Sequence, residues 1–196
     1  MDLKTVQLYD EKAEEYARLV TSLDEPDQDL AAFIADLPTG GTVLDLGCGP
    51  GNSAALLARA GFQVTATDAS SGMIELAARH EGVTARQATF DELDTEATYD
   101  GVFANFSLLH AARADLPRHL TAIKRALKPG GVFHIGMKTG DGAHRDTLER
   151  FYSYYSVAEL EALLTEAGLT PYARREGEGR GLSGSVDPFV ILRARA

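Results

Sequence analysis

Short apolar runs alternate with segments of helical periodicity from Thr42 almost to the end of the chain, and this alternation is the strongest constraint on the fold. Strands and helices in this order are typical of βαβ units, whose right-handed crossovers cover both faces of a parallel sheet with helices. We therefore predict an α/β fold, doubly wound around a mostly parallel sheet. The expected strands are 42–46, 62–67, 83–87, 99–105, 132–137, 169–174 and 189–193, and the expected helices are 53–60, 71–79, 116–127 and one that begins at Ser156.

The residues before this alternation are predicted to be helical. Apolar side chains recur at steps of three and four through residues 5–20, and a second helix is expected between Pro26 and Pro38. We expect residues 1–40 to form a helical lid segment over a core formed by residues 41–196. Both belong to a single domain, because 196 residues are few for two domains of about 100–200 residues each.

Charge and cysteine content exclude several classes of function. The chain has 19 Lys and Arg against 29 Asp and Glu, a net charge of −10, which argues against a nucleic-acid partner bound through bulk charge. No run of about 18 apolar residues could span a membrane, and the N-terminus lacks the apolar region of a signal peptide, so the expected location is the cytoplasm. The single cysteine, Cys48, excludes a disulfide within the chain and a Cys-rich zinc site, so no metal is predicted. We expect a monomer or a homodimer.

The segment Val43–Asn52, V-L-D-L-G-C-G-P-G-N, joins the first strand to the helix that follows it. Its glycines let the main chain turn tightly and approach a ligand. A dinucleotide site would require a third glycine where Asn52 stands, so the G-x-G-x-x-G pattern fails. Asp45 precedes the first glycine by two residues; it would repel a pyrophosphate and suits a cationic ligand. S-adenosylmethionine carries a sulfonium and an ammonium group and has no phosphate.

The sequence D-L-G-C-G-P-G resembles motif I of the class I S-adenosylmethionine-dependent methyltransferases. The resemblance extends from about Tyr9 to the end of the chain, and residues 42–137 carry its specific motifs. It implies a Rossmann-like, seven-stranded sheet whose last strand is antiparallel. It also implies S-adenosylmethionine as the cofactor and S-adenosylhomocysteine as the product. The A-N-F-S-L-L-H and L-K-P-G-G segments look most like a subgroup of small bacterial methyltransferases.

The resemblance also implies which residues hold the cofactor. The carboxylate at the end of the second strand, Asp68, would accept hydrogen bonds from the ribose diol. Met73 would flank the adenine, and residues 89–91 occupy the place where the family commonly has an acidic pair near the adenine amino group. The first helix would lie over the cofactor through its tyrosines. The candidate cofactor-binding residues are Tyr9, Tyr16, Asp45, Gly47, Cys48, Gly49, Gly51, Asp68, Ala69, Met73, Thr89, Phe90, Asp91 and Asn105.

The acceptor is expected beyond the fourth strand, because ligands of such sheets bind outside the carboxyl ends of the strands. The N/D-P-P-Y/F/W motif of enzymes acting on nucleobase or glutamine amides matches here only at Asn105, which argues against those substrates. His110 is the candidate general base, since its ordinary pKa lies near neutrality; the alternative is a histidine of the helix start or core. Residues 138–155 are rich in cations and aromatic side chains. This segment could form a lid that contacts an anionic or aromatic acceptor; the alternative is a solvated loop without such a role. The candidate acceptor-binding residues are Lys138, Arg145, Arg150 and Tyr154.

These features predict S-adenosylmethionine-dependent methyl transfer to a small-molecule acceptor, by in-line attack on the sulfonium methyl group. Two alternatives keep the cofactor: a protein or RNA methyltransferase, and a non-catalytic S-adenosylmethionine-binding module. A third, a nicotinamide-dependent oxidoreductase, is disfavoured by the broken G-x-G-x-x-G pattern. The sequence leaves open which compound is methylated, and whether on O, N, S or C.

Overall fold

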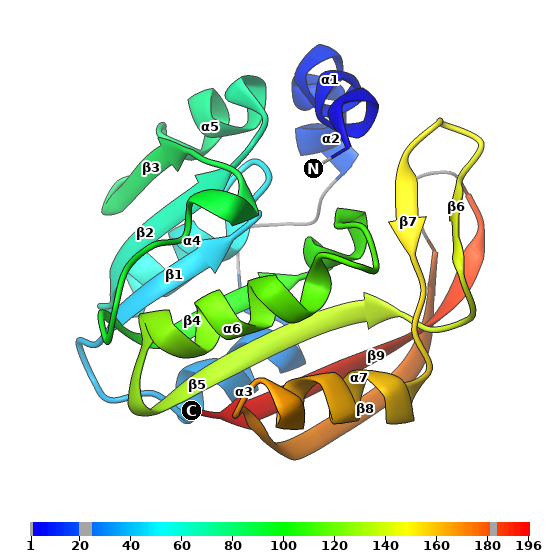
Figure 1. Cartoon of the computed structure of the whole chain (residues 1–196). Coiled ribbons are helices and arrows are strands. Elements are labelled where there is room, and N and C mark those ends of the chain that lie inside the picture. Colours follow the sequence, from blue (N-terminus) through cyan, green and yellow to red (C-terminus); the bar gives the residue numbers. More distant parts are fainter. Residues whose placement is uncertain (1, 20–24, 181–183) are drawn as a thin grey trace.

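The computed structural model describes residues 2–19, 25–180 and 184–196, and its centre is a seven-stranded sheet with the strand order β3-β2-β1-β4-β5-β9-β8 (Figure 1). The strands β1 to β5 pair in parallel, and β9 is antiparallel to both of its neighbours. This confirms the predicted sheet, including its antiparallel last strand. The strands are β1 (Thr42–Leu46), β2 (Gln63–Asp68), β3 (Val83–Gln87), β4 (Tyr99–Asn105), β5 (Leu127–Lys138), β8 (Thr170–Arg180) and β9 (Val186–Arg195).

Helices cover both faces of this sheet, as the alternation predicts. Neighbouring strand residues point to opposite faces, so Val43 and Leu44 belong to two different hydrophobic cores. One core holds α6 and α7, and the other holds α3 and α4 (Figure 1). The helices are α3 (Gln28–Ala35), α4 (Asn52–Arg59), α5 (Ser71–Ala77), α6 (Leu116–Ala126) and α7 (Val157–Glu166), and none of the helices in the described residues is long and apolar enough to cross a membrane.

The N-terminal segment divides into two parts. Residues 5–20 were expected to form one helix, but the described residues form α1 (Leu3–Glu11) and α2 (Ala13–Leu19), separated at Lys12, which leaves the helical conformation with φ −115°. Both helices pack against α5 at the end of the sheet toward which the parallel strands run (Figure 1). In contrast, α3 packs in the core, where Phe33 lies 5.2 Å from the ring of Phe103. Of the three N-terminal helices in the described residues, α1 and α2 therefore lie over the carboxyl ends of the strands, and α3 does not.

Residues 138–155 contain a hairpin that the sequence patterns do not predict. It consists of β6 (Ala143–Arg145) and β7 (Phe151–Ser153), and it projects beyond the sheet (Figure 1). Asp146 organises the turn by accepting hydrogen bonds from the backbone N–H groups of Leu148 and Arg150. The hairpin is also tied to α1, because the Phe151 N–H donates to Thr5 Oγ1 at 2.9 Å.

Candidate active site

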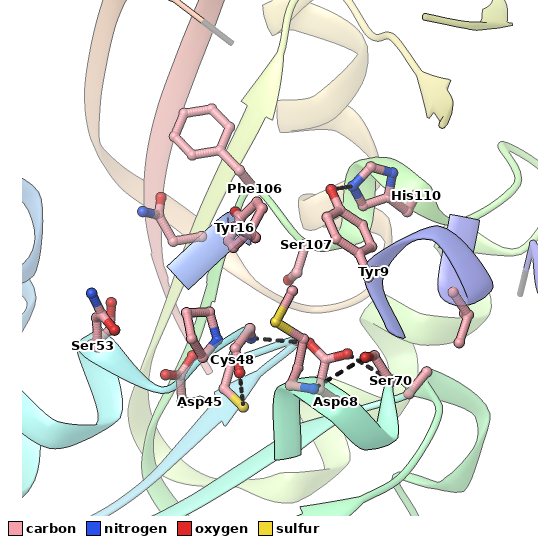
Figure 2. Close-up of a pocket in the computed structure, with 18 of the residues that line it drawn as sticks. Tyr9, Tyr16, Asp45, Cys48, Ser53, Asp68, Ser70, Phe106, Ser107 and His110 are labelled. Atoms are coloured by element: carbon pink, nitrogen blue, oxygen red, sulfur yellow. Dashed lines mark hydrogen bonds between the residues drawn. The ribbon is translucent and has the colours of Figure 1, made fainter. Parts of the chain in front are cut away.

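A cavity of about 240 Å³ lies at the carboxyl ends of β1, β2 and β4, beneath α1 and α2 (Figure 2). Most of the residues proposed from the sequence meet in its wall. Two short 3₁₀ turns complete it, η1 (Phe90–Glu92) and η2 (Leu108–His110). The sequence-predicted residues that line the cavity are Tyr9, Tyr16, Asp45, Gly47, Cys48, Gly49, Asp68, Ala69, Met73, Phe90, Asn105 and His110.

The glycine loop after β1 folds back onto β2. The N–H groups of Gly47 and Cys48 both donate to the carbonyl of Thr67, at 2.7 and 2.9 Å. Gly47 has φ +73°, and a Cβ atom there would lie 2.3 Å from Cβ of Ser107. Gly51, with φ +87°, does not line the cavity: a Cβ there would meet Ala77 of α5 at 2.8 Å. Gly51 therefore permits the packing of two helices.

Asp45 is a buried carboxylate that faces the cavity, with only 3% of its surface exposed (Figure 2). Its Oδ2 atom is buried without a hydrogen-bond partner among the described residues. Burial, and secondarily the charge of Asp68, raises the pKa of Asp45 to about 7. A buried carboxylate is stabilised when a cation or a donor pairs with it. The site is thus suited to a ligand that brings a positive charge to Asp45.

Asp68 lies at the end of β2 and joins the glycine loop to α5. Its Oδ2 accepts from the Gly49 N–H at 3.0 Å, and its Oδ1 accepts from the Ser70 N–H at 2.9 Å. Burial raises its pKa, although these backbone hydrogen bonds oppose the shift. Each carboxylate oxygen has two lone pairs, so both keep acceptor capacity for a diol. The Ser70 hydroxyl donates to Asp10 of α1 at 2.7 Å, which ties the lid to this end of the site.

The segment predicted near the adenine contributes only one of its three candidates to the cavity. Phe90 lines the wall, as does the buried Met73 of α5. Thr89 instead donates to Glu92 through both its N–H and its hydroxyl. Asp91 points away and pairs with Arg118 of α6. A 3₁₀ turn places successive side chains on different sides, which explains why neighbours diverge here.

His110 and Tyr9 lie side by side in the cavity wall, with Tyr9 Oη 3.0 Å from His110 Nε2 (Figure 2). His110 Nδ1 lies 2.7 Å from the carbonyl oxygen of Phe151, which can only accept. Nδ1 therefore carries the hydrogen, and the lone pair of Nε2 accepts from the Tyr9 hydroxyl. Burial lowers the pKa of His110 to about 4, so the ring is neutral near pH 7. Tyr16 packs edge-on against Tyr9, with ring centroids 5.5 Å apart.

The four residues predicted to bind the acceptor do not line the cavity. Their cations are paired with carboxylates: Lys138 with Asp187, Arg145 with Asp2, and Arg150 with Asp146, each at 2.6 to 2.7 Å. The remaining one, Tyr154, is buried and stacks on His144 with ring centroids 4.4 Å apart. Arg150 alone approaches the site, since its Nη1 donates to Tyr9 Oη at 3.3 Å. The structure thus places this group in the support of α1.

Several lining residues were not predicted. Phe106 and Ser107 directly follow β4, and the rule that ligands bind beyond the carboxyl ends of the strands would have pointed to them. Ser70 is the N-cap of α5, and serine is one of the residue types preferred at that position, so its place could have been predicted. The others are brought to the cavity by packing between distant segments. The unpredicted lining residues are Thr5, Val6, Pro50, Asn52, Ser53, Ser70, Phe103, Phe106 and Ser107.

Comparisons with known proteins agree with this geometry. Residues 43–131 match a family model described as a methyltransferase domain. The chain is 38% identical over 132 residues to a cypemycin N-terminal methyltransferase of Streptomyces sp, covering 64% of this chain and 54% of that protein. It is 36% identical over 130 residues to a trans-aconitate 2-methyltransferase of Rhizobium meliloti (strain 1021), covering 64% and 49%. The chain thus spans about half the length of these curated relatives.

A solved structure resembles almost the whole chain. It is a 1,6-didemethyltoxoflavin-N1-methyltransferase of Burkholderia thailandensis, with bound 1,6-didemethyltoxoflavin and S-adenosylhomocysteine. The sequence identity is 28% and the TM-score is 0.78, over 97% of this chain and 87% of that one. The likeness therefore includes the N-terminal helices and the late strands, which lie outside residues 43–131.

Proposed function

Because this chain belongs to the class I S-adenosylmethionine-dependent methyltransferases, we propose that it transfers the methyl group of S-adenosylmethionine to a small-molecule acceptor. The observation that carries the proposal is the buried, unpaired Oδ2 of Asp45, in one cavity with the glycine loop and with Asp68. These groups match a ligand with an ammonium group at one end and a ribose diol at the other. They do not match a pyrophosphate, which both carboxylates would repel.

The residues of the cavity fit the cofactor in a definite order. Asp45 would pair with the methionine ammonium group, and the backbone of the glycine loop would admit the neighbouring atoms. Asp68 would hold the ribose hydroxyls, and Met73 and Phe90 would flank the adenine. When bound, S-adenosylmethionine supplies a methyl group on a positively charged sulfur, which leaves readily as a neutral thioether.

With an activated methyl group, the task of the protein is mainly to position the acceptor. Holding two reactants in line is worth up to about 7–11 kcal/mol when the geometry is ideal. The lid formed by α1 and α2 would contribute by excluding water from the cavity. We further propose that His110 Nε2 orients an N–H or O–H group of the acceptor, in exchange for its present partner Tyr9. Its pKa of about 4 makes it a weak base, better suited to accepting a hydrogen bond than to full removal of a proton.

A small-molecule acceptor is supported by the names of two of the similar proteins, which specify trans-aconitate and 1,6-didemethyltoxoflavin. A peptide acceptor is the second candidate, because the cypemycin enzyme is named for an N-terminal methylation. Since α1 and α2 lie over the cavity, we favour an acceptor small enough to fit beneath them.

Thermal unfolding tests the cofactor assignment. Ligand at 100 times its Kd should stabilise the protein by about 2.7 kcal/mol, which corresponds to a rise in Tm of roughly 5–11 °C at this chain length. We expect this rise with S-adenosylmethionine and S-adenosylhomocysteine, and no rise with NAD. Absence of a rise with either sulfur compound at millimolar concentration would refute the proposal. Binding without label transfer from methyl-labelled cofactor to any acceptor would indicate a non-catalytic module.

A further inference from the structure

The cavity has two halves with different chemistry. Its charged lining residues, among those that the structure describes, are Asp45 and Asp68, on β1 and β2. The other half lies around the end of β4, which is on the opposite side of β1 from β2. We call it the acceptor half; it consists of Tyr9, Phe103, Asn105, Phe106 and His110. Every side chain of the acceptor half is uncharged near pH 7, and four of the five are aromatic rings.

Among the described residues, the cations near the acceptor half are each paired with a carboxylate. Lys138 and Arg150 are largely buried and bonded to Asp187 and Asp146, with N···O distances of 2.7 and 2.6 Å. Arg150 also donates to Tyr9 Oη at 3.3 Å, and Arg145 is bonded to Asp2 at 2.7 Å. An anionic ligand would therefore have to compete with these carboxylates for a counter-charge, and it would lie close to Asp45 and Asp68. Burying a charge without a partner is strongly unfavourable, so the cavity disfavours carboxylates and phosphates.

Phe106 is held in an unusual conformation at this half of the cavity. Its φ is +55°, in the left-handed region that residues other than glycine rarely adopt. Its N–H donates to the carbonyl of Gly136 at 3.0 Å, which fixes the backbone, and its ring meets Phe189 edge-on at 5.6 Å. Phe106 as a whole is 36% exposed, so a large apolar residue lines the cavity without being buried in the core. Residues held in sparsely populated backbone conformations cluster at active sites and ligand contacts.

Asn105, predicted from the sequence as a cofactor-binding residue, lies at the end of β4 and is assigned here to the acceptor half, where it supplies a directed pair of donors. His134 Nε2 lies 3.3 Å from Asn105 Oδ1, and His134 Nδ1 is buried without a partner among the described residues. Buried N–H groups without partners are rarer than buried acceptors without partners, so the hydrogen belongs on Nε2. Asn105 Oδ1 is then the acceptor of this bond. Asn105 lines the cavity, and its amide NH₂ group is left to donate to a ligand.

We propose that the acceptor half binds an uncharged, planar ring compound. The ring packs on Phe106, and a carbonyl oxygen or ring nitrogen of the compound accepts a hydrogen bond from the Asn105 amide. This inference rests on the proposed function, since it concerns the second substrate of the same cavity. The sequence predicts an anionic or aromatic acceptor; the proposal keeps the aromatic alternative and drops the anionic one, because the cations on which the latter depended are paired with carboxylates.

Binding of matched compounds to protein saturated with S-adenosylhomocysteine tests the proposal. The probes are 4-hydroxyquinoline against its 2-carboxylate, and uracil against its 6-carboxylate, with ethanolamine as a cationic probe without a ring. Calorimetry is expected to show at least tenfold tighter binding for the uncharged member of a pair. The proposal is overturned if the carboxylate or ethanolamine binds as tightly as the uncharged ring compounds or more tightly. It is also overturned if none of the ring compounds binds. Failure of S-adenosylhomocysteine itself to bind would instead refute the proposed function.

Two variants then locate the bound ring. Asn105→Asp removes the donors without changing shape and should weaken the uncharged probes at least tenfold, while S-adenosylhomocysteine still binds. The control is Gln63→Glu, which makes the same change from amide to carboxylate at an exposed strand position. It should alter neither the affinity for the probes nor the affinity for S-adenosylhomocysteine. Phe106→Gly relieves the positive φ, so it should keep or raise Tm and still lose affinity for ring compounds. The assignment is overturned if both variants, Asn105→Asp and Phe106→Gly, bind the probes as tightly as the native protein. It is also overturned if Asn105→Asp loses as much affinity for S-adenosylhomocysteine as it loses for the probes.

Discussion

Asp45 shows how one buried residue couples protonation to ligand binding. Burial raises its pKa from the ordinary 3.8 to about 7, so the folded protein binds a proton that the unfolded chain has released. Between about pH 4 and pH 7 the folded state therefore holds more protons than the unfolded state. The free energy of unfolding contributed by this group decreases as pH rises through that window. A cation bound at Asp45 would reverse this loss.

The affinity for S-adenosylmethionine should therefore depend on pH through Asp45. Only the ionised carboxylate pairs with an ammonium group, so affinity should rise up to about pH 7 by at most about tenfold per pH unit. Calorimetric titrations between about pH 5 and pH 7 measure this directly, below the range near pH 8 in which an α-amino group loses its proton. Asp45→Asn should bind more weakly and without the pH dependence, whereas Asp94→Asn, at an exposed position, should behave like the native protein. A flat profile for the native protein would contradict the role of Asp45.

Asp68→Ala should abolish most of the cofactor-induced stabilisation. The variant loses the proposed ribose acceptor and also the acceptor of the Gly49 and Ser70 N–H groups, so the protein without ligand should melt at a lower temperature as well. The rise of roughly 5–11 °C expected for the native protein with S-adenosylhomocysteine at 100 times its Kd should fall to near zero. Thermal melts with and without ligand separate the two effects. A full rise in Asp68→Ala would exclude this residue from the binding site.

At the scale of elements, the β6–β7 hairpin and α1 form one unit. Thr5 accepts from Phe151, Asp2 pairs with Arg145, and Arg150 reaches Tyr9, so three bonds from one hairpin hold the helix that covers the cavity. Few of these residues belong to the large cores, and α1 packs mainly on α5. Elements with few core contacts open at lower free energy than the rest of a protein. The lid is therefore the element whose opening would admit ligands.

Thr5→Val should loosen this lid. The change keeps the shape of the side chain but leaves the Phe151 N–H without its acceptor, at a cost of about 1–3 kcal/mol. Hydrogen exchange should become faster in α1 and in β6–β7, with little change in β1 and β4, and the cofactor should bind more weakly. Thr121→Val on the exposed face of α6 removes a similar side-chain bond and serves as the control. Unchanged exchange in α1 would show that other contacts hold the lid.

At the scale of the whole molecule, stability and ligand binding depend on different ends of the chain. The strand β9 lies between β5 and β8, and its residues Val190 and Leu192 are buried in the largest core. The helices α1 and α2 contribute instead to a small cluster around Ala13, Met73 and Leu76. Removal of each end should consequently have a different effect.

Deletion of residues 1–25 should leave a protein that still unfolds cooperatively but has lost most of its affinity for S-adenosylhomocysteine. Deletion of residues 169–196 exposes the edge of β5 and removes part of the core, so it should abolish cooperative unfolding. Circular dichroism melts and ligand titrations of both truncations make the comparison. A C-terminal truncation that melts cooperatively would contradict this division of roles.

The architecture could be predicted from the amino-acid sequence, because strand and helix signals are local and repeat along the chain. The apolar runs around Val43, Val64 and Val102 indicate buried strands. The segments of helical periodicity between them predict the helices that cover the two faces of the sheet. The glycines after β1 and the acid at the end of β2 were also evident, since a parallel sheet brings the carboxyl ends of its strands to one edge. Most candidate residues on these loops accordingly meet in the cavity.

The pairing of distant charges and the choice of which neighbouring side chains face the cavity depend on how the folded segments pack together. Lys138 and Arg145 pair with Asp187 and Asp2, which lie 49 and 143 positions away, and no local pattern predicts such pairings. Arg150 pairs with Asp146, four residues away, within the fold of the β6–β7 hairpin. Orientation within short turns is likewise set by packing, which is why Phe90 faces the site while Asp91 faces α6. Burial also turned His110 into a neutral ring and Asp45 into a proton-holding carboxyl. These properties depend on desolvation and distance, which exist only once the chain is folded.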